Sequence, residues 1–171
     1  ILRGVFIMEH YYTNNPTTES REKIINSTIA NENFKFYTDN GVFSKESVDF
    51  GTKTMLESFN TEKENAQVAD IGCGYGVISI FLAKKYPTFK FTMVDVNNRV
   101  LELSKKNIEL NKIENEVEVL ESSSFDNVEG TFDIVLTNPP IRAGKKIVHK
   151  IMTDSYEHLN PQGELWVVIQ K

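Results

Sequence analysis

The sequence contains one cysteine, Cys73, and only three histidines. A lone thiol excludes a disulfide framework and any cluster in which several cysteines bind a metal. His10, His149 and His158 lie far apart and do not have the spacing of zinc ligands. We therefore expect no metal site.

Long apolar runs and an excess of positive charge are also missing. No apolar run approaches the roughly 20 residues that a membrane helix needs. We therefore expect no membrane contact and, given the unpaired thiol, a cytoplasmic protein. The 24 Asp and Glu residues outnumber the 19 Lys and Arg residues, which gives a formal charge of -5. This balance excludes a surface that is basic throughout, but not a local basic patch.

Length and composition fit one domain. Hydrophobic residues make up 40% of the 171 residues, enough for a core, and the 25% of charged residues indicates a globular chain. We interpret residues 1–7 as a cloning remnant or upstream read-through before Met8, and a trimmed signal peptide is the alternative. We expect residues 8–35 to form a loose polar arm and residues 36–171 to form the folded domain.

Apolar segments alternate with helical patterns along the second half of the chain. This alternation predicts an α/β fold with a doubly wound, mainly parallel sheet. Short strands and a helix from Ser44 onward are expected before it. A turn is expected at residues 160–163. The expected strands are residues 24–29, 34–37, 67–71, 89–95, 117–120, 132–136 and 165–169, and the other expected helices are residues 77–86, 97–111 and 144–159.

The last expected strand, residues 165–169, is the most apolar of the series. A parallel strand of this composition favours neighbours on both sides. We therefore expect that a C-terminal piece of the fold is missing from this sequence. A tolerated edge strand is the alternative.

Glycines occupy every second position between the first strand of the series and the next helix, at Gly72, Gly74 and Gly76. They allow a sharp bend and a close approach to a ligand. The spacing is not that of the dinucleotide fingerprint, and no Gly-Lys-Ser/Thr of a phosphate-binding loop follows. The turn therefore favours a nucleotide without phosphates, with Asp70 facing an ammonium group directly or through water. A turn needed only for packing is the alternative.

The pattern from Asp70 to Gly76 resembles motif I of the class I S-adenosylmethionine-dependent methyltransferases. The resemblance implies a Rossmann-like methyltransferase sheet with S-adenosylmethionine as its cofactor. Asp95, at the end of the next strand, is expected to accept hydrogen bonds from ribose hydroxyls, and Val96 to pack on the adenine. The family often has an aspartate near residue 123, where an acceptor meets the adenine amine. Here the aligned residue is Ser123, which accepts without a charge.

Asn138, Pro139 and Pro140 follow a strand and form the most specific motif. An exocyclic amine is a poor nucleophile because its lone pair is delocalised. Two acceptors, the Asn138 side-chain oxygen and the Pro139 carbonyl, can hold such an amine and aim its lone pair at a methyl donor. A rigid turn is the alternative reading. Because this motif and the preceding ones all end successive parallel strands, we expect them at one edge of the sheet.

The residues after the prolines concern the substrate. Ile141 stands where many relatives have an aromatic residue, so only apolar contact remains. Residues 141–150 contain four Lys or Arg residues and no acid, which predicts phosphate contacts from Arg142 and Lys145 at a helix N-terminus. A basic helix face that balances Asp154 and Glu157 is the alternative.

A narrower resemblance rests on Asn138 to Lys145 together with residues 39–44 and 49–51. These segments are similar to those of small, single-domain relatives of the small-subunit (16S) ribosomal RNA guanine-N2 methyltransferases. The resemblance implies that Phe43 and its neighbours fold over the cofactor, and that ribosomal RNA or the small subunit is the partner. It also implies that the usual sheet ends in a further helix and a C-terminal strand pair, which this sequence lacks. The alternatives are a protein glutamine N5 methyltransferase and a catalytically silent cofactor- or RNA-binding module.

Overall fold

A computed structural model describes residues 19–169. The residues predicted as an added segment, 1–7, and the first part of the predicted arm lie outside this range. The elements are β1 (Lys23–Ile29), β2 (Glu32–Thr38), α2 (Phe50–Ser58), β3 (Gln67–Ile71), α3 (Val77–Lys85), β4 (Lys90–Asp95), α4 (Asn98–Leu110), β5 (Val117–Glu121), β6 (Phe132–Thr137), a 3-10 turn η1 (Ile141–Ala143), α5 (Lys145–Glu157) and β7 (Leu159–Val167).

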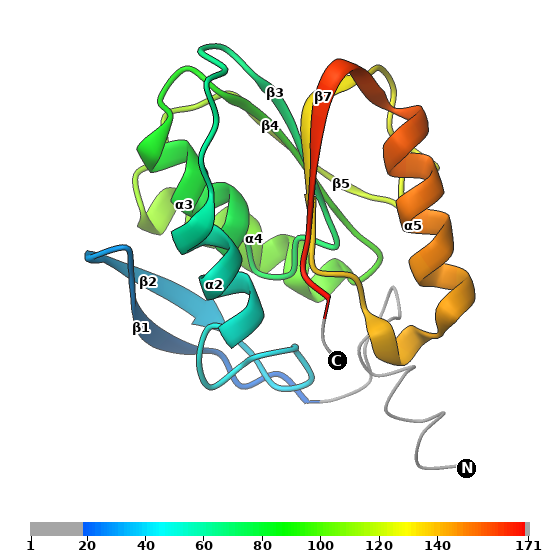
Figure 1. Ribbon diagram of the computed structural model, residues 1–171. Helices are drawn as coiled ribbons and strands as arrows, with labels where there is room; N and C mark the ends of the chain where they lie inside the picture. The colour runs from blue at the N-terminus through cyan, green and yellow to red at the C-terminus, as the bar shows by residue number, and fades with distance from the viewer. Residues whose placement is uncertain (1–18, 170–171) are drawn as a thin grey trace.

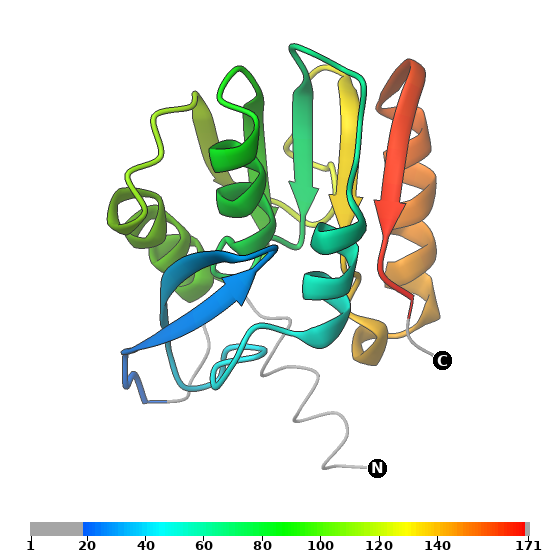
Figure 2. The same ribbon diagram turned by 60° about the vertical axis from the view of Figure 1, so that its left-hand side comes forward.

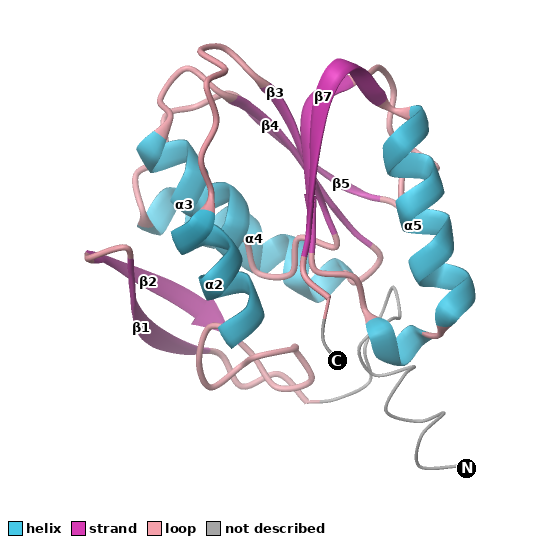
Figure 3. Cartoon of the chain, in the orientation of Figure 1, coloured by secondary structure: helices cyan, strands magenta, loops and turns pink. Residues whose placement is uncertain are grey.

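A five-stranded parallel sheet forms the centre of the molecule, with strand order β5-β4-β3-β6-β7. The order reverses between β3 and β6, so the chain leaves these two neighbouring strands in opposite directions. In such sheets, ligands bind beyond the carboxyl ends of the strands at this reversal. The confirmed fold class is thus an α/β, doubly wound, Rossmann-like sheet, with helices on both of its sides (Figures 1 and 3).

Each face of the sheet has its own apolar core. Val68, Met93 and Leu136 belong to the larger core, which includes side chains of α2, α3 and α4. Their strand neighbours Ala69 and Val135 belong to the smaller core, which includes Ile151 of α5 and residues of the β5–β6 connection. The alternation along each strand follows from the two-residue period of side chains in a β-strand, and it makes the central strands apolar on both faces.

The predicted strands at residues 24–29 and 34–37 are present as the antiparallel hairpin β1–β2. It packs against α4 through the buried side chain of Asn107. The amide of Asn107 accepts from Tyr37 N at 2.6 Å and donates to the carbonyls of Tyr37 and Tyr75 at 3.1 and 2.7 Å. One side chain therefore joins the hairpin to the glycine turn.

Two expectations about secondary structure were wrong. The helix expected from Ser44 begins only at Phe50, because Ser44 has a positive φ of 57° and the Asp49 carboxylate caps the helix by accepting from Thr52 N. The turn expected at residues 160–163 lies inside β7. Between the pairs Phe132–Leu159 and Ile134–Glu164 the register shifts, so these residues bulge from the strand.

Within residues 19–169, β7 is an edge strand of the sheet. Its Trp166 packs on Phe59 at the end of α2, with ring centroids 4.8 Å apart, and its Glu164 accepts from Thr61 Oγ1 at 2.7 Å. These contacts attach the edge to the segment that precedes β3.

No helix within residues 19–169 has the length and apolar character needed to cross a membrane.

Candidate active site

A cleft of about 220 Å3 opens at the carboxyl ends of β3, β4 and β6. Figure 2 shows the arrowheads of the parallel strands on the side of the sheet where the loop of residues 39–49 lies. The sequence-predicted residues that line the cleft are Phe43, Gly72, Gly74, Asp95, Val96, Asn138, Pro139, Pro140, Ile141 and Arg142. The glycine turn and the diproline corner, residues 138–140, thus meet in one cavity, whereas Asp70, Gly76, Ser123 and Lys145 are not among its lining residues.

The first two glycines of the turn face the cleft. Gly72 and Gly74 have φ values of +72° and +55°, and a Cβ built at either would meet no atom within 4 Å. Gly72 N donates to Val94 O at 2.9 Å, which ties the turn to β4. A cradle without side chains is the shape that close approach of a nucleoside requires. Gly76 has a different role, because a Cβ there would lie 3.1 Å from Ile80 and 3.2 Å from Met93.

Asp70 lies beneath the turn rather than at its surface. Its side chain is fully buried, Oδ2 accepts from Ser79 Oγ at 2.6 Å, and Oδ1 has no hydrogen-bond partner in the described chain. Burial raises the pKa of this carboxyl to about 7. The structure therefore does not bring Asp70 to the wall for a direct contact. The predicted contact of Asp70 with an ammonium group through water stays a prediction.

Asp95 ends β4 and forms the next part of the wall. Its Oδ2 accepts from Gly74 N and its Oδ1 from Asn97 N, both at 3.0 Å. These bonds hold the carboxylate at the mouth of the glycine turn, while burial raises its pKa. Val96 is 8% exposed and lines the cleft beside it. The pair offers acceptors next to an apolar surface, as a ribose and its base need.

The serines after β5 face the cleft in a different order from the one expected. Ser122 and Ser124 line the cleft, and Ser123 does not. The Oγ of Ser122 donates to Ser124 O at 2.9 Å and accepts from Asn127 N at 3.0 Å. This local turn, in which Ser124 has a φ of +52°, aims the run so that its first and third residues face the cavity. Alignment alone does not give this orientation.

The diproline corner is held by the N-terminus of α2. Asn138 Nδ2 donates to Asp49 Oδ2 and to Thr52 Oγ1, both at 3.0 Å. Since a carboxylate only accepts, the amide nitrogen must face Asp49, and Asn138 Oδ1 is turned away from it as an acceptor. The carbonyl of Pro140 is used by Ala143 N at 2.8 Å. Within the described chain this leaves the carbonyl of Pro139 as the second acceptor of the corner.

The basic run after the corner divides into two groups. Lys150 is engaged by acids, since its Nζ lies 2.8 Å from Asp154 Oδ2 and also contacts Asp126. Arg142 lines the cleft, and Lys145 begins α5 as an exposed residue. The alternative of a charge-balanced helix face therefore holds for Lys150. Phosphate contact remains a proposal for Arg142 and Lys145.

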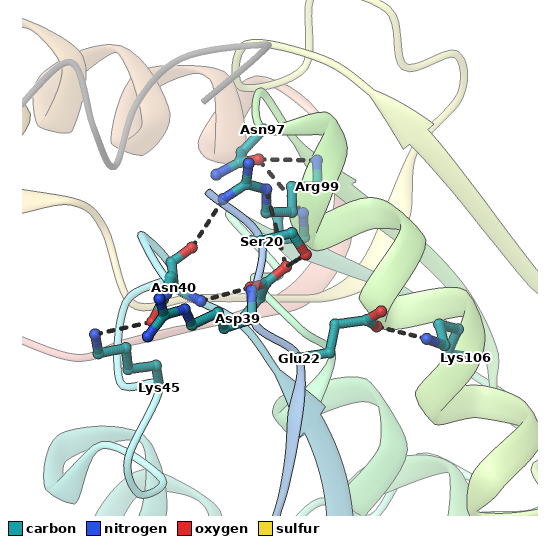
Figure 4. Close-up of polar contacts among 10 residues, drawn as sticks. Ser20, Glu22, Asp39, Asn40, Lys45, Asn97, Arg99 and Lys106 are labelled. Atoms are coloured by element: carbon teal, nitrogen blue, oxygen red, sulfur yellow. Dashed lines mark hydrogen bonds and ion pairs between the residues drawn. The ribbon is translucent and has the colours of Figure 1, made fainter. Parts of the chain in front are cut away.

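The loop of residues 39–49 covers one side of the cleft and is anchored at its start (Figure 4). Asp39 is 2% exposed and accepts from Ser20 Oγ at 2.6 Å and from Asn40 N at 2.7 Å. Arg99 of α4 donates to Asn40 O at 3.0 Å, and its Nε lies 4.0 Å from Asp39. Burial opposes ionisation of Asp39, but the hydrogen bonds and Arg99 outweigh it and lower its pKa. Phe43 on this loop lines the cleft, and its contact with the cofactor stays a prediction.

Sequence reasoning missed several residues of the wall. Thr52, Tyr75 and Asn97 line the cleft, and Tyr75 Oη donates to Ser44 O at 3.0 Å, which joins the glycine turn to the loop of residues 39–49. The sequence did contain a signal for Thr52. An aspartate at the start of a helical pattern, such as Asp49, indicates an N-cap whose side chain accepts from the backbone N–H three residues later. The others depend on packing between segments distant in sequence.

Comparisons with known proteins identify the family of this chain. The model of the methyltransferase small domain family matches residues 33–171. The uncharacterized protein YbxB of Bacillus subtilis (strain 168) is 46% identical over 165 residues, which cover 95% of this chain and 82% of YbxB. Ribosomal RNA small subunit methyltransferase C of Haemophilus influenzae (strain PittGG) is 36% identical over 141 residues, or 80% of this chain.

The chain spans about 42% of the length of that Haemophilus influenzae relative. Among solved structures, the T. thermophilus 16S rRNA N2 G1207 methyltransferase (RsmC), in complex with AdoMet and guanosine, superposes with a TM-score of 0.78 at 23% identity. The match covers 89% of this chain and 43% of that one. This likeness supports the fold. Because the family model matches most of the chain and YbxB is 46% identical to it, the chain belongs to the methyltransferase small domain family. Members of this family are S-adenosylmethionine-dependent methyltransferases.

Proposed function

We propose that this chain methylates the exocyclic N2 amine of a guanine in small-subunit ribosomal RNA. The observation that carries the proposal is the fixed orientation of Asn138, whose amide nitrogen is held by Asp49 and Thr52. This leaves Asn138 Oδ1 to accept from a substrate amine. The name of the Haemophilus influenzae relative supports small-subunit rRNA as the substrate, and the T. thermophilus structure in complex with guanosine supports guanine as the base.

When bound, S-adenosylmethionine would supply a methyl group, whose carbon the amine nitrogen attacks as the bond to the positively charged sulfur breaks. The methylated amine then releases one proton to solvent. The residues that fit this cofactor are Gly72 and Gly74, whose faces are open, and Asp95 with Val96. Ser122 and Ser124, rather than Ser123, line the neighbouring part of the wall.

The diproline corner orients the nitrogen that receives the methyl group. Asn138 Oδ1 and the Pro139 carbonyl each accept one amine N–H, which draws the nitrogen lone pair out of conjugation and toward the donor. Both acceptors are set before substrate binds, one by Asp49 and one by the restricted proline backbone. Arg142 and Lys145 contact the phosphates of the strand that carries the guanine.

The test is labelled methyl transfer to ribosomal RNA or small subunits from cells that lack the gene, followed by nucleoside analysis. We expect N2-methylguanosine. Asn138→Ala should reduce transfer about 10²–10³-fold, as loss of one preorganised contact does, and should keep cofactor affinity. Asn60→Ala is the control, since Asn60 is exposed and outside the cleft lining.

Two results would contradict the proposal. Label in protein glutamine instead of RNA would favour the alternative glutamine methyltransferase, although Ile141 provides no aromatic surface at its usual position. Calorimetry without S-adenosylmethionine binding would favour a catalytically silent module.

A further inference from the structure

Large apolar side chains are exposed around the mouth of the cleft. Phe43 is 55% exposed, Phe50 is 83% exposed and Ile141 is 47% exposed. Phe43 and Ile141 line the cleft itself. Phe50 lines a shallow hollow that shares four wall residues with the cleft. We call Phe43, Phe50 and Ile141 the apolar rim. Half of the well-exposed large apolar residues in the described chain belong to it, and such gathering at a site marks a contact surface.

The backbone of Phe50 is held in place although its ring is exposed to solvent. It is the first residue of α2, and the preceding residue, Asp49, both caps the helix and accepts from the Asn138 amide. The backbone of Phe50 is therefore fixed one residue away from a direct contact with the diproline corner. Packing does not account for the ring, because it is the most exposed large apolar side chain of residues 19–169.

The depth of the cleft determines what such a ring can meet. Pro139 is buried and Asn138 is half-buried, so a base amine reaches their acceptors only after the base has left its stack. A neighbouring base then lacks a stacking partner on one face. An aromatic side chain replaces that partner, and it does so for any base because every base has a π face.

Charges around the rim suit a nucleic-acid strand. Arg142 lines the cleft beside Ile141, and Lys145 and Lys146 are exposed on the first turn of α5. No acid lies in that turn. Glu46 in the hollow is paired with Lys23. An apolar face next to cations that have no ion pair within residues 19–169 matches a base and its phosphates better than it matches an apolar protein segment.

We propose that the ring of Phe50 stacks on an unpaired nucleobase that adjoins the target base in a single-stranded RNA segment. Ile141, which lines the cleft with the diproline corner, contacts the target base. This inference rests on the proposed RNA substrate, and it adds that the substrate segment is unpaired on at least one side of the target.

The experiment compares the affinity of the full chain for a fluorescent single-stranded guanine-containing RNA, and kcat/KM on the same RNA, among variants of Phe50. Phe50→Ala should weaken binding about 5- to 100-fold, the range for loss of one base–aromatic stack. Phe50→Trp should retain affinity. Phe50→Leu should lose most of it, because leucine keeps the apolar area but not the ring. S-adenosylmethionine affinity should stay unchanged in all three.

Tyr156→Ala is the matched control, since Tyr156 is 80% exposed, lies on α5 and lines neither the cleft nor the hollow. Equal affinity of Phe50→Ala and Tyr156→Ala would overturn the stacking while leaving RNA methylation in place. The stacking would also be overturned if Phe50→Leu bound the RNA with wild-type affinity. The same holds if a fully paired RNA duplex lost as much affinity on Phe50→Ala as the single strand does. Wild-type transfer to protein and not to RNA would instead refute the proposed function together with the stacking.

Discussion

The carboxylate of Asp49 and the side-chain amide of Asn138 are joined by a hydrogen bond of 3.0 Å across 89 residues of sequence. Asp49 uses the same oxygen to cap α2, so the start of one helix sets the orientation of the residue that receives the substrate amine. Thr52 accepts the second N–H of Asn138. Asp49 and Thr52 are thus positioning residues for the proposed reaction.

Replacing the acceptor while keeping the helix cap tests this relationship. Asp49→Asn should lower kcat about 10-fold or more and change KM for S-adenosylmethionine little, because the new amide no longer forces the Asn138 nitrogen toward it. The stability should change by only a few tenths of a kcal/mol, since asparagine is as good an N-cap as aspartate. Steady-state kinetics with thermal unfolding separate the two effects. A normal kcat would show that Asn138 needs no such support.

Alanine substitutions at two glycines of the turn should have different effects, one mainly on cofactor binding and the other mainly on stability. Gly74→Ala should weaken S-adenosylmethionine binding strongly and cost roughly 1–2 kcal/mol of stability, because its Cβ faces the cleft at a φ of +55°. Gly76→Ala should destabilise by roughly 2–4 kcal/mol, because its Cβ would press on Ile80 and Met93 at a φ of +104°. Calorimetry and urea unfolding measure the two quantities. A fully stable Gly76→Ala variant would contradict the packing argument.

The buried carboxyl of Asp70 predicts a pH dependence of the cofactor-free protein. Its pKa is raised to about 7 by burial, and the pKa of Asp95 is raised as well. The native state therefore binds more protons than the unfolded state above pH 4. The free energy of unfolding should consequently fall as the pH rises from about 4 to 7 and then level off.

Asp70→Asn should remove part of this fall, roughly 2–4 kcal/mol, in urea unfolding at pH 5 and pH 8. Asp39 acts outside this window, because its pKa is lowered and its contribution disappears only as the pH falls below about 4. A pH dependence unchanged in Asp70→Asn would show that another group carries it.

The anchor of the loop of residues 39–49 is testable through Arg99. Arg99→Ala removes the hydrogen bond to Asn40 O and the charge beside Asp39. We expect a stability loss of about 1–2 kcal/mol and a several-fold higher KM for S-adenosylmethionine. Lys105→Ala on the same helix is the control, because its pair with Glu102 is exposed and such pairs contribute little. Equal kinetics for the two variants would exclude a role of the anchor in binding.

The sequence by itself determined the order of strands and helices, the parallel sheet and the edge at which the glycine turn and the diproline corner meet. Hydrophobic periodicity and turn residues act over short distances, and the right-handed crossover rule then limits the topology. The predicted strands at residues 67–71, 117–120 and 132–136 accordingly agree with β3, β5 and β6 within one residue.

Only the tertiary structure decided which side chains face the cleft. It buried Asp70 on Ser79, turned Ser122 and Ser124 rather than Ser123 toward the cavity, and joined Asp49 to Asn138. The physical reason is that hydrogen bonds between distant segments and the φ values of single turn residues fix these orientations. Neither leaves a periodic trace in the sequence.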